Sequence, residues 1–332
     1  MNAFLLMKGA RKVVEVCTAV KPGEKVVVVT DNTLLHVADA IAGAAYERGA
    51  ETVITVMPPP AVDGAEPPRA VVEALKAADV GIMPLSYSIS HSEGIREALK
   101  SGTRIGALSG FTTDMMVRGG IEADFVKFRP LCDAVAAAFG EAREAVLTTP
   151  AGTHVVMDLK GRPGNSHPCI VDKPGKYSAI PNIEANVSPV AGEGTIVFDG
   201  SVPNLRMGVV DAPIIVEVRN GRIVEIRGGK QAAVLRTIWE REKDPTVYTV
   251  AQLAVGLNPF CTAFTGVFLN DHGAYGTVHI GIGTSAALGG DTQSAMHVDG
   301  MMYNPTLKLD GQAIIEDGKV LIGSAAELLA TV

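Results

Sequence analysis

The stretch that decides the fold class is Lys25-Val-Val-Val-Val-Thr30, an apolar run without polar alternation. Such a run is typical of a strand that is buried on both faces of a parallel sheet. Helix-like and strand-like segments alternate after it: the predicted helices are residues 37–50, 68–78 and 93–101, and the predicted strands are residues 51–57, 80–85 and 104–109. This βαβα order predicts a doubly wound α/β domain with a parallel sheet and right-handed crossovers.

The C-terminal half has a different composition and a different predicted secondary structure. A helical pattern over residues 121–146 is followed, from Thr153 onward, by a segment rich in β-branched residues, Gly and Pro. Strands are predicted over residues 154–158, 194–198, 214–218 and 222–226, and one helix over residues 231–243. Asn220-Gly221 between the last two strands is a type I′ hairpin signal. We therefore expect an α/β scaffold domain over residues 1–148 and a mostly antiparallel, β-rich (α+β) catalytic domain over residues 149–332.

Composition excludes several classes of partner. The net charge is -7 and no run of Lys or Arg occurs, so neither nucleic acid nor an anionic membrane is an expected partner. No segment has the unbroken apolar length of a transmembrane helix. The four cysteines are scattered without a CxxC pair, which is typical of buried thiols in a reducing compartment. These features predict a cytoplasmic protein; a small-molecule or short-peptide substrate is what the family resemblances described below imply.

The first domain carries no nucleotide-binding motif. The turn after its first strand reads Thr30-Asp-Asn-Thr33, not G-x-G-x-x-G, and there is no P-loop. Ser86-Tyr-Ser-Ile-Ser-His91 follows the carboxyl end of a predicted strand, where open α/β sheets often bind ligands. We expect this domain to act mainly as a scaffold.

Histidines concentrate in the second domain. Thr277-Val-His279-Ile-Gly-Ile-Gly283 is a predicted strand on which His279 shares a face with Thr277 and Gly281, whose small side chains leave room for an ion or a substrate. In Met296-His297-Val-Asp299 a histidine and a carboxylate share a face if the segment is extended. Imidazole nitrogens and carboxylate oxygens are the usual ligands of Zn, Mn, Fe and Co. The sequence therefore predicts a metal site at His279, His297 and Asp299.

Four segments resemble the thermophilic aminopeptidase T family of metallopeptidases: Pro181-Asn-Ile-Glu184, Ala251-Gln-Leu-Ala-Val-Gly-Leu-Asn-Pro259, Gly276-Thr-Val-His-Ile-Gly-Ile-Gly283 and His297-Val-Asp299. The resemblance covers most of the chain and is specific in the C-terminal half. It implies a two-domain chain, a homo-oligomer and metal ligands at Glu184, His279, His297 and Asp299, with Tyr303 as a lesser candidate.

Two positions depart from that family. Gln252 stands where the family carries its second ligand carboxylate, and a neutral amide binds a divalent ion more weakly and adds no charge to offset a pair of cations. Gln252 is therefore a candidate ligand that favours a single-metal site. His272 stands where an acidic residue is usual, and as an imidazole it is a candidate general base; a surface loop position is its alternative interpretation.

The chain also resembles the 2,5-dihydroxypyridine 5,6-dioxygenase family. Asp244-Pro-Thr-Val-Tyr248, Gly256-Leu-Asn-Pro259 and His297-Val-Asp299 carry this second resemblance. It implies a two-histidine, one-carboxylate Fe(II) site. The family's first histidine falls at Gln252, so only His297 and Asp299 match, and we hypothesise that His279 completes the triad.

Three functions follow in order of expectation. The first is an aminopeptidase-like hydrolase that uses Zn, Mn or Co, with Glu184 or His272 as the proton acceptor. The second is an Fe(II) ring-cleaving dioxygenase that acts on a hydroxypyridine-like aromatic. The third is a non-catalytic family member, which the neutral Gln252 would favour.

Overall fold

The computed structural model describes residues 3–90, 92–323 and 325–330, so His91 lies outside the described residues. The chain forms two compact units. Unit 1 comprises residues 1–126 and 167–182, and unit 2 comprises residues 127–166 and 183–332. The expected division at residue 148 differs from these units in two segments. Residues 127–148 belong to unit 2, and residues 167–182 return to unit 1.

Unit 1 is built on a five-stranded parallel sheet in the order β2-β1-β3-β4-β8. Its strands are β1 (Lys25–Asp31), β2 (Glu51–Met57), β3 (Val80–Leu85), β4 (Arg104–Ser109) and β8 (Tyr177–Ala179). β3 and β4 are buried at every residue, as the apolar runs predict. The predicted α/β class and the four predicted strands are confirmed. β8, which pairs with β4, is an addition from beyond the expected boundary.

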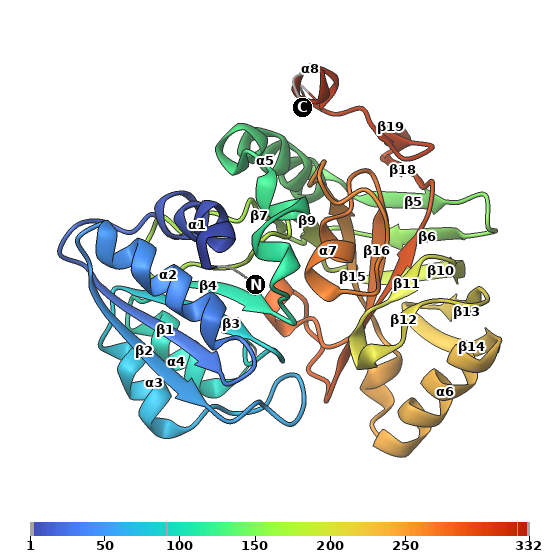
Figure 1. Cartoon of the computed structure of the whole chain (residues 1–332). Helices are drawn as coiled ribbons and strands as arrows, with labels where there is room; N and C mark the ends of the chain where they lie inside the picture. Colours follow the sequence, from blue (N-terminus) through green and yellow to red (C-terminus); the bar gives the residue numbers. More distant parts are fainter. Residues whose placement is uncertain (1–2, 91, 324, 331–332) are drawn as a thin grey trace. The chain divides into compact units, whose positions relative to one another are not determined.

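Helices cover both faces of this sheet, as a doubly wound fold requires. α1 (Ala3–Lys12) packs on α2 (Leu35–Glu47), while α3 (Arg69–Lys76) packs beside α4 (Glu93–Lys100) (Figure 1). Because the chain passes from β1 to β2 on one side and then to β3 on the other, the carboxyl ends of β1 and β3 form the switch point of the sheet.

Unit 2 is β-rich and mostly antiparallel, as predicted. One sheet has eight strands in the order β14-β13-β10-β6-β5-β18-β19-β20. Their bounds are β5 (Glu144–Thr148), β6 (His154–Asp158), β10 (Ala191–Phe198), β13 (Ile214–Arg219), β14 (Arg222–Gly228), β18 (Thr306–Leu309), β19 (Gln312–Glu316) and β20 (Lys319–Val320). Asn220 and Gly221 both have positive φ (46° and 71°), which confirms the predicted hairpin between β13 and β14.

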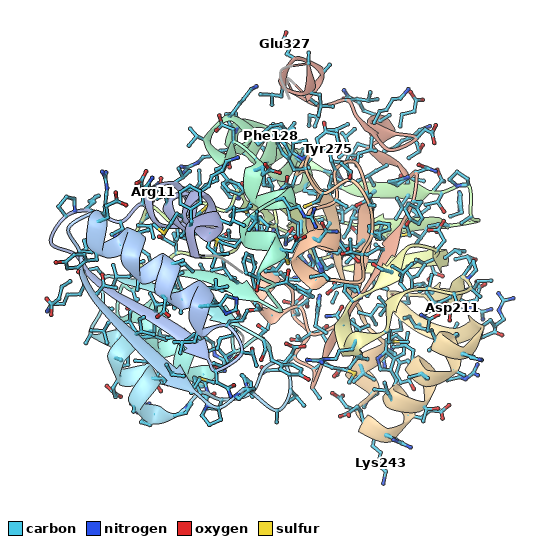
Figure 2. All side chains as sticks on the ribbon, in the orientation of Figure 1. Arg11, Phe128, Asp211, Lys243, Tyr275 and Glu327 are labelled. Atoms are coloured by element: carbon cyan, nitrogen blue, oxygen red, sulfur yellow. The ribbon has the colours of Figure 1, made fainter. Side chains whose placement is uncertain are left out.

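The helices of unit 2 cover its sheets and its ends. α5 (Phe125–Glu141), most of which belongs to this unit, is shorter than the predicted 121–146, because residues 144–148 form β5. α6 (Lys230–Glu242) matches its prediction, and α8 (Ala325–Leu329) lies near the C-terminus. Lys243 after α6 and Glu327 on α8 are exposed, whereas Phe128 on α5 is buried (Figure 2).

A second sheet of unit 2 positions the candidate site. It has the order β17-β16-β15-β9-β7, with β7 (Gly164–His167), β9 (Glu184–Val187), β15 (Val250–Gly256), β16 (Val278–Gly283) and β17 (His297–Met302). A two-stranded sheet of β11 (Ser201–Val202) and β12 (Gly208–Val209) completes the unit. β15 and β16 are buried at every residue, so polar side chains on them face a closed interior.

Two predictions from composition can be compared with the fold. All four cysteines are buried thiols, as the scattered positions predict. Among the described helices, none combines the length and the apolar character needed to cross a membrane.

Candidate metal centre

Strand pairing brings the predicted residues to one face of the second sheet. Gln252 on β15 pairs with Gly281 on β16, which pairs with Asp299 on β17. Directly paired residues point to the same face, and so do residues two apart along a strand. His279, two residues from Gly281, and His297, two residues from Asp299, therefore share this face. The structure thus joins segments more than forty residues apart in sequence, such as Gln252 and Asp299.

Glu184 reaches the same face from the neighbouring strand. It pairs with Gly256 on β15, and its strand neighbour Asn186 pairs with Ala254. Its Oε1 accepts hydrogen bonds from Gln252 Nε2 at 2.9 Å and from Asn186 Nδ2 at 2.7 Å. Its Oε2 lies 3.7 Å from His279 Nε2. The five predicted metal-site residues are therefore together in one cluster.

His272 joins the cluster from above the sheet. It lies on α7 (Phe268–Gly273), which packs against β15, and is 3% exposed. The ring of Phe268 covers its ring at 3.9 Å between centroids, and the His279 ring lies at 4.5 Å. Its alternative interpretation as a surface loop residue is wrong, because this short helix turns it into the interior.

Asp299 is the centre of the cluster. Its Oδ1 lies 3.0 Å from His297 Nε2, and its Oδ2 lies 3.1 Å from His272 Nε2. The other ring nitrogen of each histidine contacts a backbone carbonyl: Nδ1 of His297 lies 2.8 Å from Thr284 O, and Nδ1 of His272 lies 2.8 Å from Phe268 O. A carbonyl only accepts, so both Nδ1 atoms carry hydrogen. In the neutral rings, the Nε2 lone pairs therefore face the carboxylate.

This arrangement fits a divalent metal ion. Histidine ligands of metals usually donate their second N–H to a carbonyl or carboxylate, as His272 and His297 do here. His272 Nε2 and His279 Nδ1 are buried and have no hydrogen-bond partner among the described residues. His272, His279 and Asp299 each offer a ligand atom, and these atoms lie within 4.8 Å of one another. A cation shared by the three would give His272 Nε2 the partner that it lacks.

Burial and charge move the pKa values of the cluster apart. Burial and the neighbouring His272 lower the pKa of His279 to about 4. Burial also lowers the pKa of His297, but the carboxylate of Asp299 outweighs it and raises the pKa to about 9. Although burial raises the pKa of Asp299, His297 and His272 hold it well below its ordinary value. Asp299 is thus an anion and His279 a neutral imidazole, the forms that bind metals.

Gly281 provides the space at the centre. A Cβ on this residue would lie 2.5 Å from His297 Nε2 and 2.8 Å from Asp299 Oδ1. Any side chain here would therefore displace His297 and Asp299, which agrees with the expectation that small neighbours leave room. His297 is the most accessible of the six residues, with 21% of its side chain exposed, so it is the member of the cluster nearest to solvent.

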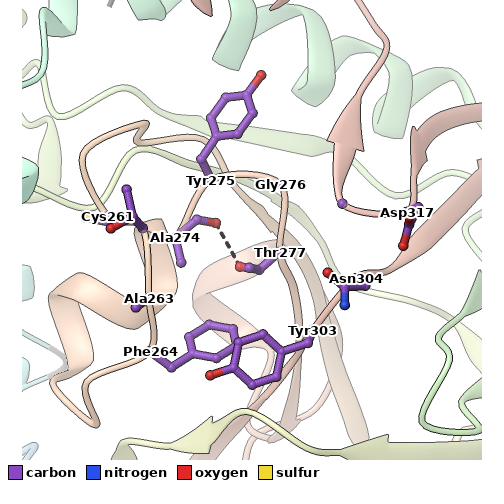
Figure 3. A pocket seen from close by; sticks show the side chains of 12 residues that line it. Cys261, Ala263, Phe264, Ala274, Tyr275, Gly276, Thr277, Tyr303, Asn304 and Asp317 are labelled. Atoms are coloured by element: carbon purple, nitrogen blue, oxygen red, sulfur yellow. Dashed lines mark hydrogen bonds between the residues drawn. The ribbon is translucent and has the colours of Figure 1, made fainter.

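A cavity of about 200 Å³ lies further along the same strands (Figure 3). Thr277 precedes β16 and donates to Ala274 O at 2.8 Å, while Tyr303 follows β17 and packs against Phe264 with ring centroids 4.6 Å apart. The lining residues in the described part of the chain include none of the six cluster residues. Tyr303, the lesser candidate, belongs to this cavity and not to the cluster.

Several supporting residues were not predicted. Asn186 and Asn165 orient Glu184, and Asn204 fixes the backbone of β17 by accepting from Asp299 N at 2.8 Å and donating to His297 O at 3.3 Å. Of these three residues, Asn186 could have been predicted from the sequence, because it stands two residues after Glu184 and so shares its face of the strand. The other two approach from distant segments.

A two-unit α/β scaffold with a buried cluster of histidines and carboxylates defines a metalloenzyme-like protein. Comparison with known families identifies which one. Residues 5–322 match the sequence model of the NicX family, 2,5-dihydroxypyridine 5,6-dioxygenase, and the chain belongs to this family. The expected order of the functions therefore changes. The sequence placed an aminopeptidase-like hydrolase first, but membership of this enzyme family supports the dioxygenase alternative better.

Individual relatives agree with this assignment. The chain is 27% identical over 263 residues to 2,5-dihydroxypyridine 5,6-dioxygenase of Pseudomonas putida, covering 76% of this chain and 73% of that protein. The solved structure of the Pseudomonas putida KT2440 dioxygenase superposes with a TM-score of 0.85 at 22% identity, covering 98% of this chain and 99% of that one. Wild-type AmpT from Thermus thermophilus shares the fold, with a TM-score of 0.75, 15% identity and coverage of 96% and 99%. Both resemblances seen in the sequence thus reflect one scaffold.

Proposed function

We propose that this protein is an Fe(II)-dependent dioxygenase that opens the ring of a dihydroxypyridine-like aromatic. The observation that carries the proposal is the buried group His272, His279 and Asp299, in a chain that belongs to the dioxygenase family. Two histidines and one carboxylate on one side of an ion are the ligand set of non-haem Fe(II) oxygenases. When bound, Fe(II) would supply the one-electron chemistry that reaction with O₂ needs.

The ligand set differs in one member from the hypothesis drawn from sequence. His272 and His279 would hold the ion together with Asp299, and His297 would act as the charge partner of the second Asp299 oxygen. His297 fits this role because its Nε2 is already placed between Asp299 Oδ1 and Gln252 Oε1, at 3.0 and 3.1 Å. Gln252 would orient its neighbours and not bind the ion.

Glu184 is the proposed proton acceptor. Hydrogen bonds from two amides to Oε1 stabilise its ionised form and fix its plane. Oε2 then faces the cluster beside His279, where it would take the proton of a ring hydroxyl group. A hydroxylated heteroaromatic ring suits this site because it presents both an acidic O–H and neighbouring oxygen or nitrogen atoms to an ion.

The test compares oxygen consumption and peptide hydrolysis in one preparation. The chain is purified without oxygen, stripped of metal, and reconstituted with Fe(II), Mn(II) or Zn(II). We expect 2,5-dihydroxypyridine to disappear with equal consumption of O₂ only in the Fe(II) sample, and no release of amine from leucine p-nitroanilide. Hydrolysis of the amide with Zn(II) or Mn(II), without O₂ consumption, would overturn the proposal in favour of the hydrolase.

A cytoplasmic location and a homo-oligomeric state, expected from composition and from family resemblance, stay predictions. We propose them for this chain together with the small aromatic substrate. Sedimentation of the purified protein tests the second.

A further inference from the structure

The loop between β16 and β17, residues 284–296, crosses the second sheet on the face of the metal centre. It leaves and returns at one side of the order β17-β16-β15-β9-β7, yet Leu288 O accepts a hydrogen bond at 3.0 Å from Asn165 Nδ2 on β7. The same Nδ2 donates at 2.9 Å to Asn186 Oδ1, on the face of Glu184. β16 and β7 are three strand intervals apart, about 14 Å, which the first five loop residues span within their extended reach of about 17 Å. The loop therefore passes over β15 and β9.

Two further side chains anchor the loop. Arg162 Nη1 donates to Gly289 O at 3.1 Å, and its Nη2 contacts Asp291 Oδ2 at 2.5 Å. Asp244 Oδ2 accepts from Ser294 Oγ and from the next backbone N–H, both at 3.3 Å. Asp244 begins one of the segments that carried the second family resemblance in the sequence, and this contact gives it a role beside the metal centre.

Apolar packing does not hold the loop in place. Every residue of 284–296 is described, and none of its apolar side chains is buried. Segments with few buried apolar contacts open at a lower free-energy cost than the core does. The adjoining strands differ in this respect, because β16 is buried at every residue and β17 at every residue after His297. The loop can therefore leave the sheet while the two strands stay paired.

The buried metal centre needs such an opening. His272, His279 and Asp299 are at most 3% exposed. The member of the cluster nearest to solvent is His297, and its Nδ1 lies 2.8 Å from Thr284 O at the start of the loop. Movement of the loop uncovers this side of the centre without breaking any buried apolar packing of its own.

We propose that residues 284–296 form a gate over the metal centre, which opens when the anchors Arg162, Asn165 and Asp244 release it. The open gate admits an ion or an aromatic ring. The closed gate restores the hydrogen bond between the loop and His297, so the centre is complete only in the closed state. This proposal rests on the metal centre of the proposed function, but not on its reaction.

The test measures how fast Mn(II) enters and leaves the chain. Arg162→Met and Asp244→Ala each remove one anchor, and Ala287→Ser, at an exposed position of the same loop, is the matched control. Loss of a hydrogen bond to a charged group changes an equilibrium by about 10-fold or more. We expect the association rate, and the dissociation rate measured with excess EDTA, each to rise about 10-fold in the anchor variants. Kd should stay unchanged, because a gate alters both rates alike.

Equal rates in wild type and both anchor variants would overturn the proposal. Faster dissociation with unchanged association would also overturn it, because that pattern indicates a weakened ion site and not a gate. Wild type provides a test that needs no variant. Its association rate should level off at high Mn(II), where opening limits it, and a rate that keeps rising in proportion to Mn(II) contradicts the gate.

Hydrogen exchange in the metal-free chain tests the loop without any ion. We expect amides of residues 284–296 to exchange faster in the anchor variants, with β16 and β17 unchanged; equal exchange throughout would refute the role of the anchors. The outcome separates from that of the proposed function. A chain with gated Mn(II) binding that leaves dihydroxypyridine intact refutes the reaction alone, whereas an active dioxygenase whose Mn(II) rates do not respond to the anchors refutes the gate alone.

Discussion

Two buried aspartates, one in each unit, show what distinguishes a candidate site from a structural polar group. Asp31 ends β1 at the switch point of the parallel sheet, and Asp299 lies on β17; they are 0% and 1% exposed. Both have a pKa below the ordinary value in spite of burial. Position in the fold would favour Asp31, since open α/β sheets bind ligands at the switch point.

Their partners differ in kind. Asp31 accepts from Ser86 N and Ser86 Oγ, both at 2.7 Å, and from the backbone N–H of Thr33 at 2.9 Å and its hydroxyl. These donors are neutral, and they fix the loops after β1 and β3. Asp299 instead faces two imidazole rings. His297 has a pKa raised to about 9 and is charged, whereas the Nε2 of a neutral His272 points a lone pair at the carboxylate. A buried carboxylate such as Asp31, whose oxygens all accept hydrogen bonds from neutral donors, has a structural role. A buried carboxylate such as Asp299, which lies beside other atoms that can bind a metal, favours the binding of a cation.

The largest effect is expected at Asp299. In Asp299→Asn the shape is kept but the charge that holds a cation is lost, so we expect metal retention to disappear and activity to fall by more than about 100-fold, the upper end of losses seen when a residue behind a ligand is changed. Metal per chain and O₂ consumption measure this. Asp31→Asn is the matched control, and it should keep its metal. Equal metal content in the two variants would contradict the distinction.

A smaller but more local effect is expected at Gly281. In Gly281→Ala the new methyl group would displace His297 and Asp299, which we expect to weaken metal binding by about 10–100-fold. Titration with Mn(II) gives the affinity.

Gly43→Ala in α2 is the control for this substitution. An added Cβ there meets nothing within 4 Å, so metal affinity should stay unchanged while helix propensity raises stability by up to about 1 kcal/mol. If Gly281→Ala bound metal as tightly as wild type, Asp299 could not be a ligand of the ion.

The fold was predictable where local pattern decides it. Lys25-Val-Val-Val-Val-Thr30 reads as a buried parallel strand from its residues alone, and Asn220-Gly221 reads as a hairpin. β8 was not predictable, because three residues, Tyr177–Ala179, carry no periodicity and their pairing with β4 depends on the chain returning to unit 1.

The site was predictable for residues on strands and not for those brought in by packing. His297 and Asp299 are two residues apart, so extended backbone alone places them on one face. His272 lies on a six-residue helix, and its burial depends on how that helix packs on β15 and on the ring of Phe268. Neither contact leaves a periodic trace in the sequence, so its place beside Asp299 could not be derived.

We expect substitution of Asp31 to lower the stability of the metal-free chain more than substitution at the metal centre does. Asn at position 31 would turn an N–H₂ group toward the donors of Thr33 or Ser86, and a buried donor left unpaired costs about 1–3 kcal/mol. We therefore expect Asp31→Asn to lower the urea midpoint of the metal-free chain while Gly281→Ala changes it less. The reverse order would show that Asp31 is not a structural anchor of unit 1.

The smallest predicted effect concerns pH. Burial raises the pKa of Asp31, but the hydrogen bonds from Thr33 and Ser86 outweigh it and leave the folded-state pKa below the ordinary 3.8. A carboxylate whose pKa is lowered by folding stabilises the protein above its unfolded-state pKa and loses that contribution as the pH falls through the folded-state value. The difference in urea midpoint between wild type and Asp31→Asn should stay constant from pH 7 to about pH 5 and shrink below about pH 4. A difference that grows on acidification would mean that Asp31 is protonated in the folded chain, which its four neutral donors do not allow.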